Sequence, residues 1–151
     1  RDPLATALGR MPGFIVDEGE WSYFGFPDLG EGVKVGRHGH YRQEIDPELP
    51  NPPIDAADRA ATEDFMARRM PGVVPTGTRF VSCRYTMLPD EDFLIDVLPG
   101  EPRVVVASPC SGHGFKFASV VGDIVADLVV AGGTDLPIAR FSFAALRART
   151  S

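Results

Sequence analysis

The residues best suited to chemistry lie in one short stretch of small and basic residues, Ser111-Gly112-His113-Gly114-Phe115-Lys116. Apolar residues precede it from Val104 to Ala107, and an apolar helical pattern follows it, which predicts a strand, a tight turn and the start of a helix. The first turn of a helix has unpaired N–H groups and a positive end, and Lys116 adds a full charge there. The two glycines would let another molecule approach the backbone closely. An anion bound at this turn would stabilise the arrangement, but a plain strand-turn-helix with a solvated lysine explains it equally well.

Three further side chains are candidates for a binding or reactive role. Lys34 lies between valines and glycines on an expected strand, where it either faces a pocket with an apolar wall or, more commonly, is an exposed edge residue. Cys83 lies in an alternating segment, and a lone cysteine is more often a buried small hydrophobe than a nucleophile. Cys110 is the second thiol. A disulfide between the two is conceivable, but no spacing demands it.

Several other kinds of site are not supported by the residue pattern. The three histidines His38, His40 and His113 have no cysteine or carboxylate partner at metal-ligand spacing, so no metal site is expected. A Ser111–His113–Asp123 triad lacks the G-x-S-x-G elbow. No G-x-G-x-x-G follows a strand, so no dinucleotide-binding βαβ unit is encoded.

Composition narrows the class of protein. The chain has 151 residues, enough for one modest domain with a core, and its formal charge of -6 without a Lys/Arg run argues against nucleic acid. Its longest apolar stretch, residues 120–132, is short and interrupted by two aspartates, which argues against a membrane span. Two cysteines are too few for a disulfide framework, and no secretory signal precedes Leu4, so a cytoplasmic location is expected.

The elements expected in the first half surround Lys34. Strands are predicted at residues 14–16 and 21–26, joined by an acidic turn, and at residues 32–36, where Val33 and Val35 share the face opposite Lys34. A proline-rich connection over residues 46–53 precedes a helix that Asp55 caps and that ends near Met70. Its apolar face is expected to contain Ala57, Ala61, Phe65 and Met66.

The second half is expected to surround the small-residue turn. Strands are predicted at residues 80–87 and 93–97, joined by a turn at 88–91, and the strand at 104–107 is expected to be buried on both faces. A helix is predicted from Phe115 to Ala131, where Gly132-Gly133 stops it. A short strand or irregular tail follows over residues 138–143. The fold class is therefore α+β, a mainly antiparallel layer with two main helices packed on it.

Three blocks of sequence resemble a known family. Ser111-Gly112-His113-Gly114-Phe115-Lys116 is similar to the S-G-H-G-F-K motif of the monomeric sarcosine oxidase, N-methyltryptophan oxidase and pipecolate oxidase family of FAD-dependent enzymes. The segment that begins Cys83-Arg84-Tyr85-Thr86 resembles the family's C-x-Y-T…D-E-x-F-I-I-D block. Residues 23–27 and 32–38 resemble its Y-G-F-P…G-x-K-x-G-x-H block. The blocks keep the family's order and cover the chain from about Phe14 to Phe143.

The resemblance implies a flavin-dependent oxidation of an amine. Members of the family oxidise the C–N bond of a secondary or N-methyl amino acid, and dioxygen takes the electrons to give hydrogen peroxide. The resemblance implies covalent FAD through Cys83, a substrate carboxylate paired with Lys116, promotion of the oxygen reaction by Lys34, and a cavity lined by His38. A fixed cation where charge develops is electrostatic catalysis.

Further positions follow from the same alignment of motifs. Tyr85 and Phe24 are expected to line the substrate cavity, although sarcosine oxidase has a tyrosine where Phe24 stands. Ser111, Gly112, His113 and Gly114 are expected to hold the flavin edge. Arg37 replaces a more usual neutral or aromatic residue, and we expect it to face water rather than favour an acidic substrate. Cys110, where the family often has phenylalanine, is expected to pack.

The resemblance also implies a domain organisation. Residues 1–107 should belong mainly to the substrate domain and residues 108–151 to the flavin domain, whose N-terminal Rossmann half is absent from this sequence. We expect the chain alone to bind FAD poorly and to be inactive, with that missing half as its partner and a small amino acid as substrate. The exposed face of the helix at 115–131 predicts self-association. The alternatives are a non-catalytic module that binds a small carboxylate or a protein, and a flavin dehydrogenase that avoids oxygen.

Overall fold

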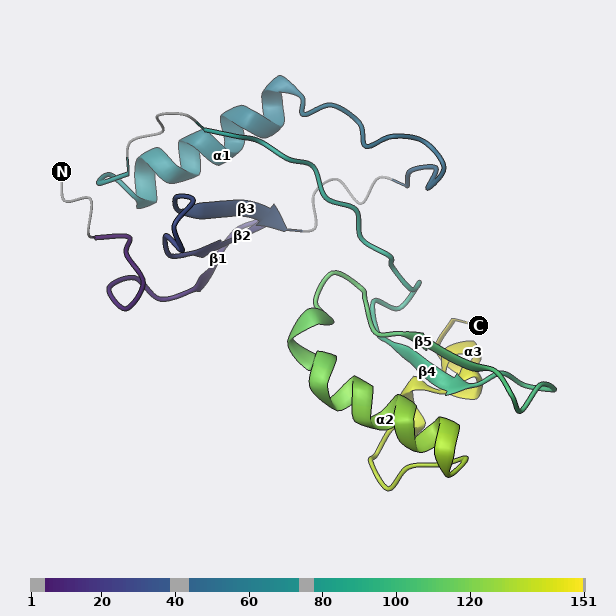
Figure 1. Ribbon diagram of the computed structural model, residues 1–151. Coiled ribbons are helices and arrows are strands. Elements are labelled where there is room, and N and C mark those ends of the chain that lie inside the picture. The colour runs from purple at the N-terminus through teal and green to yellow at the C-terminus, as the bar shows by residue number, and fades with distance from the viewer. Residues whose placement is uncertain (1–4, 39–43, 74–77, 151) are drawn as a thin grey trace. The chain divides into compact units, whose positions relative to one another are not determined.

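The computed structural model describes residues 5–38, 44–73 and 78–150, which form two compact units that divide between Cys83 and Arg84 (Figure 1). Each unit combines a small antiparallel sheet with helices, so the predicted α+β class is confirmed. His40 lies outside the described residues. The predicted boundary at residue 107 concerns domains of a complete enzyme and stays a prediction.

The first unit contains a three-stranded antiparallel sheet in the order β1-β2-β3. Its strands are β1 (Phe14–Glu18), β2 (Trp21–Phe26) and β3 (Lys34–His38). β3 begins two residues later than the predicted strand because the preceding turn extends through Gly32, which has a φ of 97°. The carboxylate of Asp28 accepts the N–H groups of Gly30 (2.7 Å) and Gly32 (2.9 Å), so this turn is held by its own side chain.

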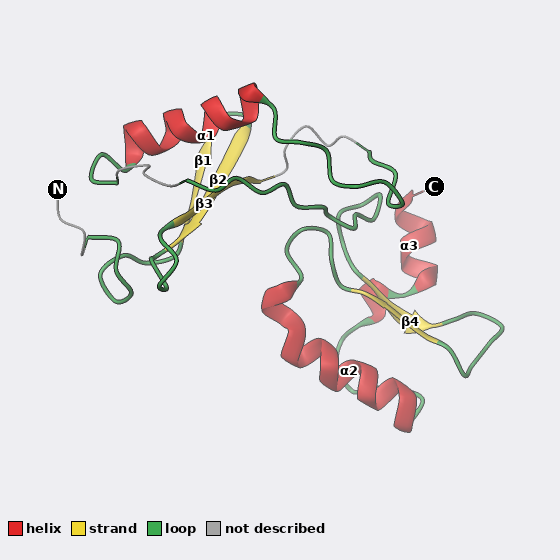
Figure 2. Ribbon diagram, turned by 45° about the horizontal axis from the view of Figure 1, so that its top comes forward, coloured by secondary structure: helices red, strands yellow, loops and turns green. Residues whose placement is uncertain are grey.

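One helix, α1 (Ala56–Arg69), covers one face of this sheet (Figures 1 and 2). Asp55 caps it as predicted, accepting the N–H of Asp58 at 2.7 Å. Phe65, only 1% exposed, stacks on Tyr23 with ring centroids 4.1 Å apart. Ala57 is exposed, so the buried face of the helix is narrower than predicted.

Ion pairs between the sheet and the end of α1 reinforce this packing. Glu18 of β1 receives hydrogen bonds from Arg68 (2.8 Å) and Arg69 (2.5 Å) of α1. These hydrogen bonds lower the pKa of Glu18 to about 2. The helix is therefore held to the sheet both by an aromatic stack and by charge.

The second unit contains a two-stranded hairpin of β4 (Leu94–Val97) and β5 (Val105–Ser108). The prediction that β5 is buried on both faces was wrong, since Val104 just before it is 39% exposed and Ala107 within it is exposed. In this unit β5 pairs only with β4, and a two-stranded sheet does not have enough neighbours to enclose it.

The prediction of a strand over residues 80–87 was also wrong. Over these residues no ladder forms, and the segment runs as irregular structure across the division between the two units. Alternating residues form a strand only where a neighbouring strand supplies hydrogen bonds, and among the described residues none pairs with this segment. One backbone hydrogen bond to this segment runs from the N–H of Ser111 to the carbonyl of Thr86, at 2.9 Å.

Helices pack on the hairpin. The predicted helix at 115–131 is present as a 3-10 turn, η1 (Phe115–Phe117), followed by α2 (Ala118–Val130). Buried residues Ile95, Ile124 and Leu128 form the centre of the core between α2 and the hairpin. None of the described helices is both long and apolar enough to cross a membrane.

The predicted strand or irregular tail at 138–143 was wrong, because the chain forms a 3-10 turn, η2 (Ala139–Phe141), and a third helix, α3 (Phe143–Thr150). Two side chains start α3. The hydroxyl of Ser142 accepts the N–H of Ala145 (3.1 Å), and the carboxylate of Asp96 accepts the N–H of Phe143 (2.9 Å). The Asp96 contact is a tertiary one, which explains why the local sequence did not predict this helix.

Candidate functional site

The strand register separates the candidate residues of the first unit from the helix. In the β2–β3 pair, Ser22 lies opposite His38, Phe24 opposite Gly36 and Phe26 opposite Lys34. Residues directly opposite each other point to the same face. Tyr23 and its neighbours at alternate positions face α1, so the other face carries Phe24, Phe26, Lys34 and His38 together. Three residues predicted to act on substrate or oxygen, Phe24, Lys34 and His38, thus share one sheet face.

This sheet face, defined by Ile15, Phe24, Phe26, Lys34 and His38, is the open face of the sheet. Ile15 is 75% exposed and Phe26 47% exposed, in contrast to the stacked aromatic pair beneath α1. No helix formed by the described residues of the first unit covers it (Figure 2). An exposed apolar surface that contains a lysine is the kind of surface on which an aromatic, partly anionic ligand would lie.

Lys34 is held over aromatic rings on the open face. Its Nζ lies 5.8 Å from the ring centroid of Phe24 and 5.9 Å from that of Phe26, within the range of a cation–π contact. Gly36 is needed for this arrangement, because a Cβ there would approach the Phe24 ring to 2.6 Å. The cation is therefore positioned by two rings, and neither contact neutralises its charge.

Arg37 faces the opposite way, and the expectation that it faces water was wrong. Its side chain is 9% exposed and donates to Asp58 of α1 at 2.9 Å. Its guanidinium also lies 4.5 Å from the Trp21 ring centroid. The alternation of β3 places Arg37 on the α1 side, so it binds helix to sheet and takes no part on the open face.

Both thiols are free and exposed. The exposure of Cys110 contradicts its predicted packing role, and the exposure of Cys83 removes its interpretation as a buried small hydrophobe. A thiol must be accessible to form a thioether, so the state of Cys83 fits the attachment role that the resemblance implies. Cys83 ends the first unit, and Cys110 belongs to the second.

The small-residue turn is built largely by its own contacts. Ser111, 4% exposed, has a φ of 42° and donates its hydroxyl to the carbonyl of Asp92 at 2.6 Å. Gly112 has a φ of 71°, a conformation that favours glycine. A Cβ at Gly114 would overlap the carbonyl oxygen of Pro109, so glycine is required inside the turn itself. Contacts between these residues and flavin stay predictions. The shape of the turn is set by contacts within the chain itself.

The other candidates of the second unit surround this turn. His113 stacks on Phe93 with centroids 4.8 Å apart, and its Nδ1 lies 2.8 Å from the carbonyl oxygen of Ser111. Lys116 is exposed in η1, with its Nζ 5.3 Å from the Phe117 ring centroid. It precedes α2, whose first turn has neither a capping side chain nor an acidic residue. Tyr85 is 41% exposed.

One positioning residue was missed by the sequence reasoning. Asp28 accepts the two glycine N–H groups that shape the turn before β3, and these hydrogen bonds hold the pKa of Asp28 below its usual range. The register of β3, and with it the place of Lys34, follows from this turn. The sequence contained a signal for this turn, because Asp28 precedes Gly30 by two residues and Gly32 by four.

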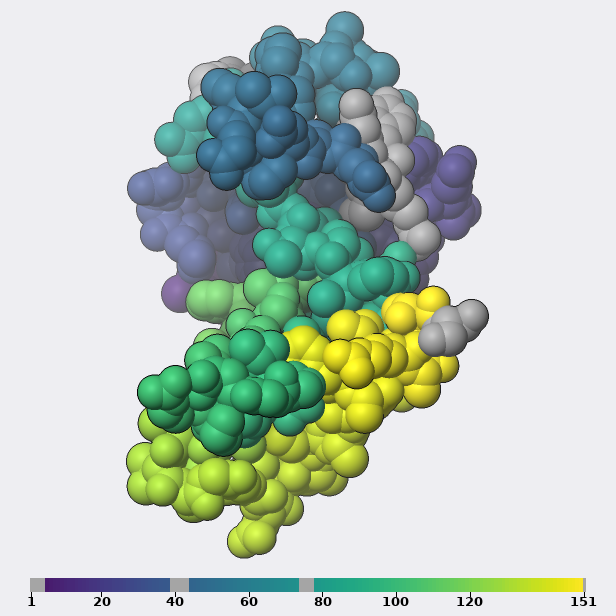
Figure 3. All heavy atoms as spheres, turned by 90° about the vertical axis from the view of Figure 1, so that its right-hand side faces the viewer, coloured from purple at the N-terminus to yellow at the C-terminus, as the bar shows by residue number. Residues whose placement is uncertain are grey.

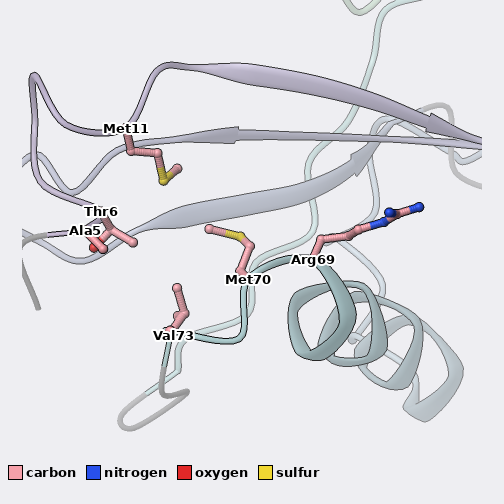
Figure 4. A pocket seen from close by; sticks show the side chains of 7 residues that line it. Ala5, Thr6, Met11, Arg69, Met70 and Val73 are labelled. Carbon is pink, nitrogen blue, oxygen red and sulfur yellow. The ribbon is translucent and has the colours of Figure 1, made fainter. Parts of the chain in front are cut away.

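Two hollows in the first unit lie away from these residues. Cavities of about 200 Å³ and about 280 Å³ adjoin the end of α1 near Met70, and Figure 4 shows the first of them. The first is lined by Ala5, Thr6, Met11, Arg69, Met70, Gly72 and Val73. None of the predicted site residues lines either one. Among the described residues, no three His, Cys, Asp or Glu side chains are grouped so as to hold a metal.

The fold and these residues define a class of protein, and comparison with known proteins establishes it. The profile of the FAD dependent oxidoreductase family matches residues 2–128 of the chain. This protein therefore belongs to the family of FAD-dependent oxidoreductases.

Within this family, the chain is similar to oxidases of N-methyl amino acids. The chain is 41% identical over 136 residues to "Monomeric sarcosine oxidase" of Bacillus sp. (strain NS-129), covering 88% of this chain and 35% of that protein. It is 40% identical over 134 residues to the enzyme of the same name from Arthrobacter sp. (strain TE1826). It is 39% identical over 149 residues to "N-methyl-L-tryptophan oxidase" of Yersinia pestis (strain Pestoides F), covering 97% of this chain and 40% of that protein. The chain thus spans little more than a third of the length of these relatives.

FAD is the cofactor that this family implies, and the residues present fit part of its site. The exposed thiol of Cys83 is free to react, the open face offers apolar surface with a cation, and the turn at 111–114 is preshaped. No phosphate-binding glycine motif is present among these residues.

Proposed function

We propose that this chain contributes the substrate-facing part of an FAD-dependent oxidase that acts on the C–N bond of a secondary or N-methyl amino acid. The observation that carries the proposal is the open face, where Phe24, Lys34 and His38 lie together on the side of the sheet away from α1. The relatives named above are sarcosine oxidases and an N-methyl-L-tryptophan oxidase. Lys34 and His38 keep the residue types of the family's motif, whereas Phe24 replaces a tyrosine. Residues 1–107 would serve mainly the substrate and residues 108–151 the flavin domain.

When bound, FAD would accept a hydride equivalent from the substrate carbon and pass both electrons to dioxygen, which leaves as hydrogen peroxide. The protein residues have simpler tasks. Lys34 supplies a fixed positive charge where oxygen gains negative charge, and an apolar surface strengthens that interaction by excluding water. Lys116 binds the substrate carboxylate, and Phe24, Tyr85 and His38 shape the space around the amine.

Attachment of the cofactor is proposed at Cys83, because its thiol is exposed and matches the family's motif. The test is co-expression with an N-terminal flavin-binding half, followed by acid denaturation and a scan for flavin absorbance that stays with the protein. Cys83→Ala should abolish the retained flavin. Cys110→Ala is the matched control, since it removes the other exposed thiol and should leave the flavin attached.

The outcomes of this experiment separate the competing functions. Loss of flavin in both variants, or in the Cys110→Ala variant alone, would contradict the assignment of Cys83. A wild-type chain that folds and stays monomeric but retains no flavin under any condition would support the binding module for a small carboxylate or a protein instead.

The role of Lys34 is tested separately in the flavin-loaded protein. Lys34→Met should slow the reaction with dioxygen by roughly 100-fold, because one preorganised electrostatic group is removed from the point where charge develops. Lys116→Met is the control of equal charge change, and it should raise the KM for the amine without that effect on reoxidation. Equal reoxidation rates in wild type and Lys34→Met would overturn the role of Lys34, and slow reoxidation of the wild type by dioxygen would favour the dehydrogenase alternative.

A partner is part of this proposal. Phe115 at the start of η1 is 96% exposed, and Val129 and Val130 at the end of α2 are 65% and 86% exposed. We propose that an N-terminal flavin-binding half covers these apolar side chains. The same surface would favour self-association of the isolated chain, which we propose is inactive without the partner. Two free thiols fit a reducing compartment, and we propose a cytoplasmic location.

A further inference from the structure

In the flavin turn, residues 111–114, the left-handed residue Ser111 makes three hydrogen bonds with a neighbouring loop, residues 86–92. Ser111 has a φ of 42°, a left-handed conformation that is unfavourable for a residue with a Cβ. Its N–H donates to the carbonyl of Thr86 (2.9 Å), and its hydroxyl donates to that of Asp92 (2.6 Å). The hydroxyl also accepts the N–H of Leu88 at 3.4 Å. The shape of the turn therefore depends on where this loop lies.

The loop at 86–92 is irregular, and two of its acidic residues bind arginines near the C-terminal end of the chain. Asp90 accepts the Nε–H of Arg149 in α3 at 2.5 Å, and the second oxygen of Asp90 accepts the N–H of Asp92 at 3.1 Å. Asp92 in turn pairs with Arg140 of η2. α3 lies against the β4–β5 hairpin, and the space-filling view shows the last described residues directly beside it (Figure 3).

Arg149 is the more enclosed of the two arginines, with its side chain 25% exposed against 69% for Arg140. Its Nη1 donates to the carbonyl of Arg140, whereas its Nη2 is buried without an acceptor among the described residues. A buried donor without an acceptor costs folding free energy.

We infer that Arg149 of α3 is a positioning residue of the flavin turn, acting through Asp90 and the loop at 86–92 to hold Ser111 in its left-handed conformation. The inference rests on the proposed function for what the turn binds, but the mechanical link is a property of the chain itself. It also assigns a role to residues beyond the 2–128 segment that the family profile matches.

The link is tested by amide hydrogen exchange on the 151-residue chain without flavin. Arg149→Gln should accelerate exchange of the Ser111 amide roughly tenfold, the scale expected for loss of one charge-assisted hydrogen bond. Amides of the β4–β5 hairpin should change by less than about twofold, since the core formed by Ile95 and α2 is left intact. Asp90→Asn should reproduce the effect without altering α3.

The control is Arg103→Gln, which breaks the exposed Arg103–Glu101 pair at the far end of the hairpin and removes the same charge. Acceleration throughout the second unit would show that Arg149 only stabilises the fold, and it would overturn the inference. Unchanged exchange of the Ser111 amide in Arg149→Gln or in Asp90→Asn would also overturn the inference.

The consequence for cofactor binding is measured in the flavin-loaded protein. When each variant is co-expressed with the N-terminal flavin-binding half, Arg149→Gln should carry less covalent flavin per protein chain than Arg103→Gln, and equal incorporation would overturn the role at the flavin turn. If the wild-type protein retains no flavin, the proposed function fails, whereas the exchange result still decides whether Arg149 holds Ser111.

Discussion

Replacing Phe65 by alanine tests the most important structural premise of the proposed site, namely that α1 covers one face of the sheet and leaves the other open. Phe65 is 1% exposed, stacks on Tyr23 at 4.1 Å and lies 6.2 Å from the ring of Phe14. Truncation of a fully buried phenylalanine costs about 3–5 kcal/mol, because apolar burial is lost and a cavity is left. The matched control is Phe26→Ala on the open face, where 47% exposure limits the cost to about 1 kcal/mol.

The assay is urea denaturation followed by tryptophan fluorescence. Trp21 is the one tryptophan of the chain and lies in β2, so its signal reports the first unit. With a slope of about 1–1.5 kcal/mol per molar urea for a unit of this size, Phe65→Ala should lower the midpoint by at least about 2 M. Phe26→Ala should lower it by less than about 1 M. Equal shifts would show that both faces of the sheet are buried, and they would refute the assignment of Phe24, Lys34 and His38 to an open site.

Two further predictions concern charge and turn geometry. The folded-state pKa of Glu18 is lowered to about 2 from the usual 4.5, so its stabilising contribution is present above about pH 4.5 and is lost as the pH falls toward 2. Glu18→Gln should flatten the acid limb of the tryptophan-monitored stability curve, and an unchanged acid limb would contradict the pairing with the two arginines. Gly114→Ala should destabilise the second unit by more than about 2 kcal/mol, because its Cβ would overlap the carbonyl of Pro109. Gly122→Ala in α2 meets no atom within 4 Å and should stabilise by up to about 1 kcal/mol, so circular dichroism melting curves that move in the same direction for both would be evidence against this geometry.

The family could be predicted from sequence because several of its motifs are continuous. Cys83 and the run from Ser111 to Lys116 carried the resemblance, and the comparisons confirm the family, whereas the roles of these residues stay predictions. The contacts of these residues could not be predicted. Ser111 was expected to hold the flavin edge, yet its hydroxyl is used by Asp92, a residue 19 positions away. Hydrogen bonds between residues far apart in the sequence cannot be predicted from the periodicity of residue types.

The fold shows the same division. The β1–β2 hairpin and α1 were predicted because alternation, a helical apolar spacing and the Asp55 cap are local signals. The segment at 80–87 had the alternation of a strand but lacks a neighbour to pair with, and α3 had little helical signal but gains a start from Asp96. In both cases tertiary surroundings overrode the local preference.

What the sequence by itself determined is the chemistry available to this protein: a thiol, two lysines and a glycine turn in the order of a flavin-dependent amine oxidase family. Only the tertiary structure decided how each is used. The sheet register put Lys34 and Phe24 on the face away from α1 and Arg37 beneath the helix, although Lys34 and Arg37 are both cations on one short strand. The reason is that side-chain direction on a strand alternates, whereas which face is covered depends on a helix some twenty residues further along the chain.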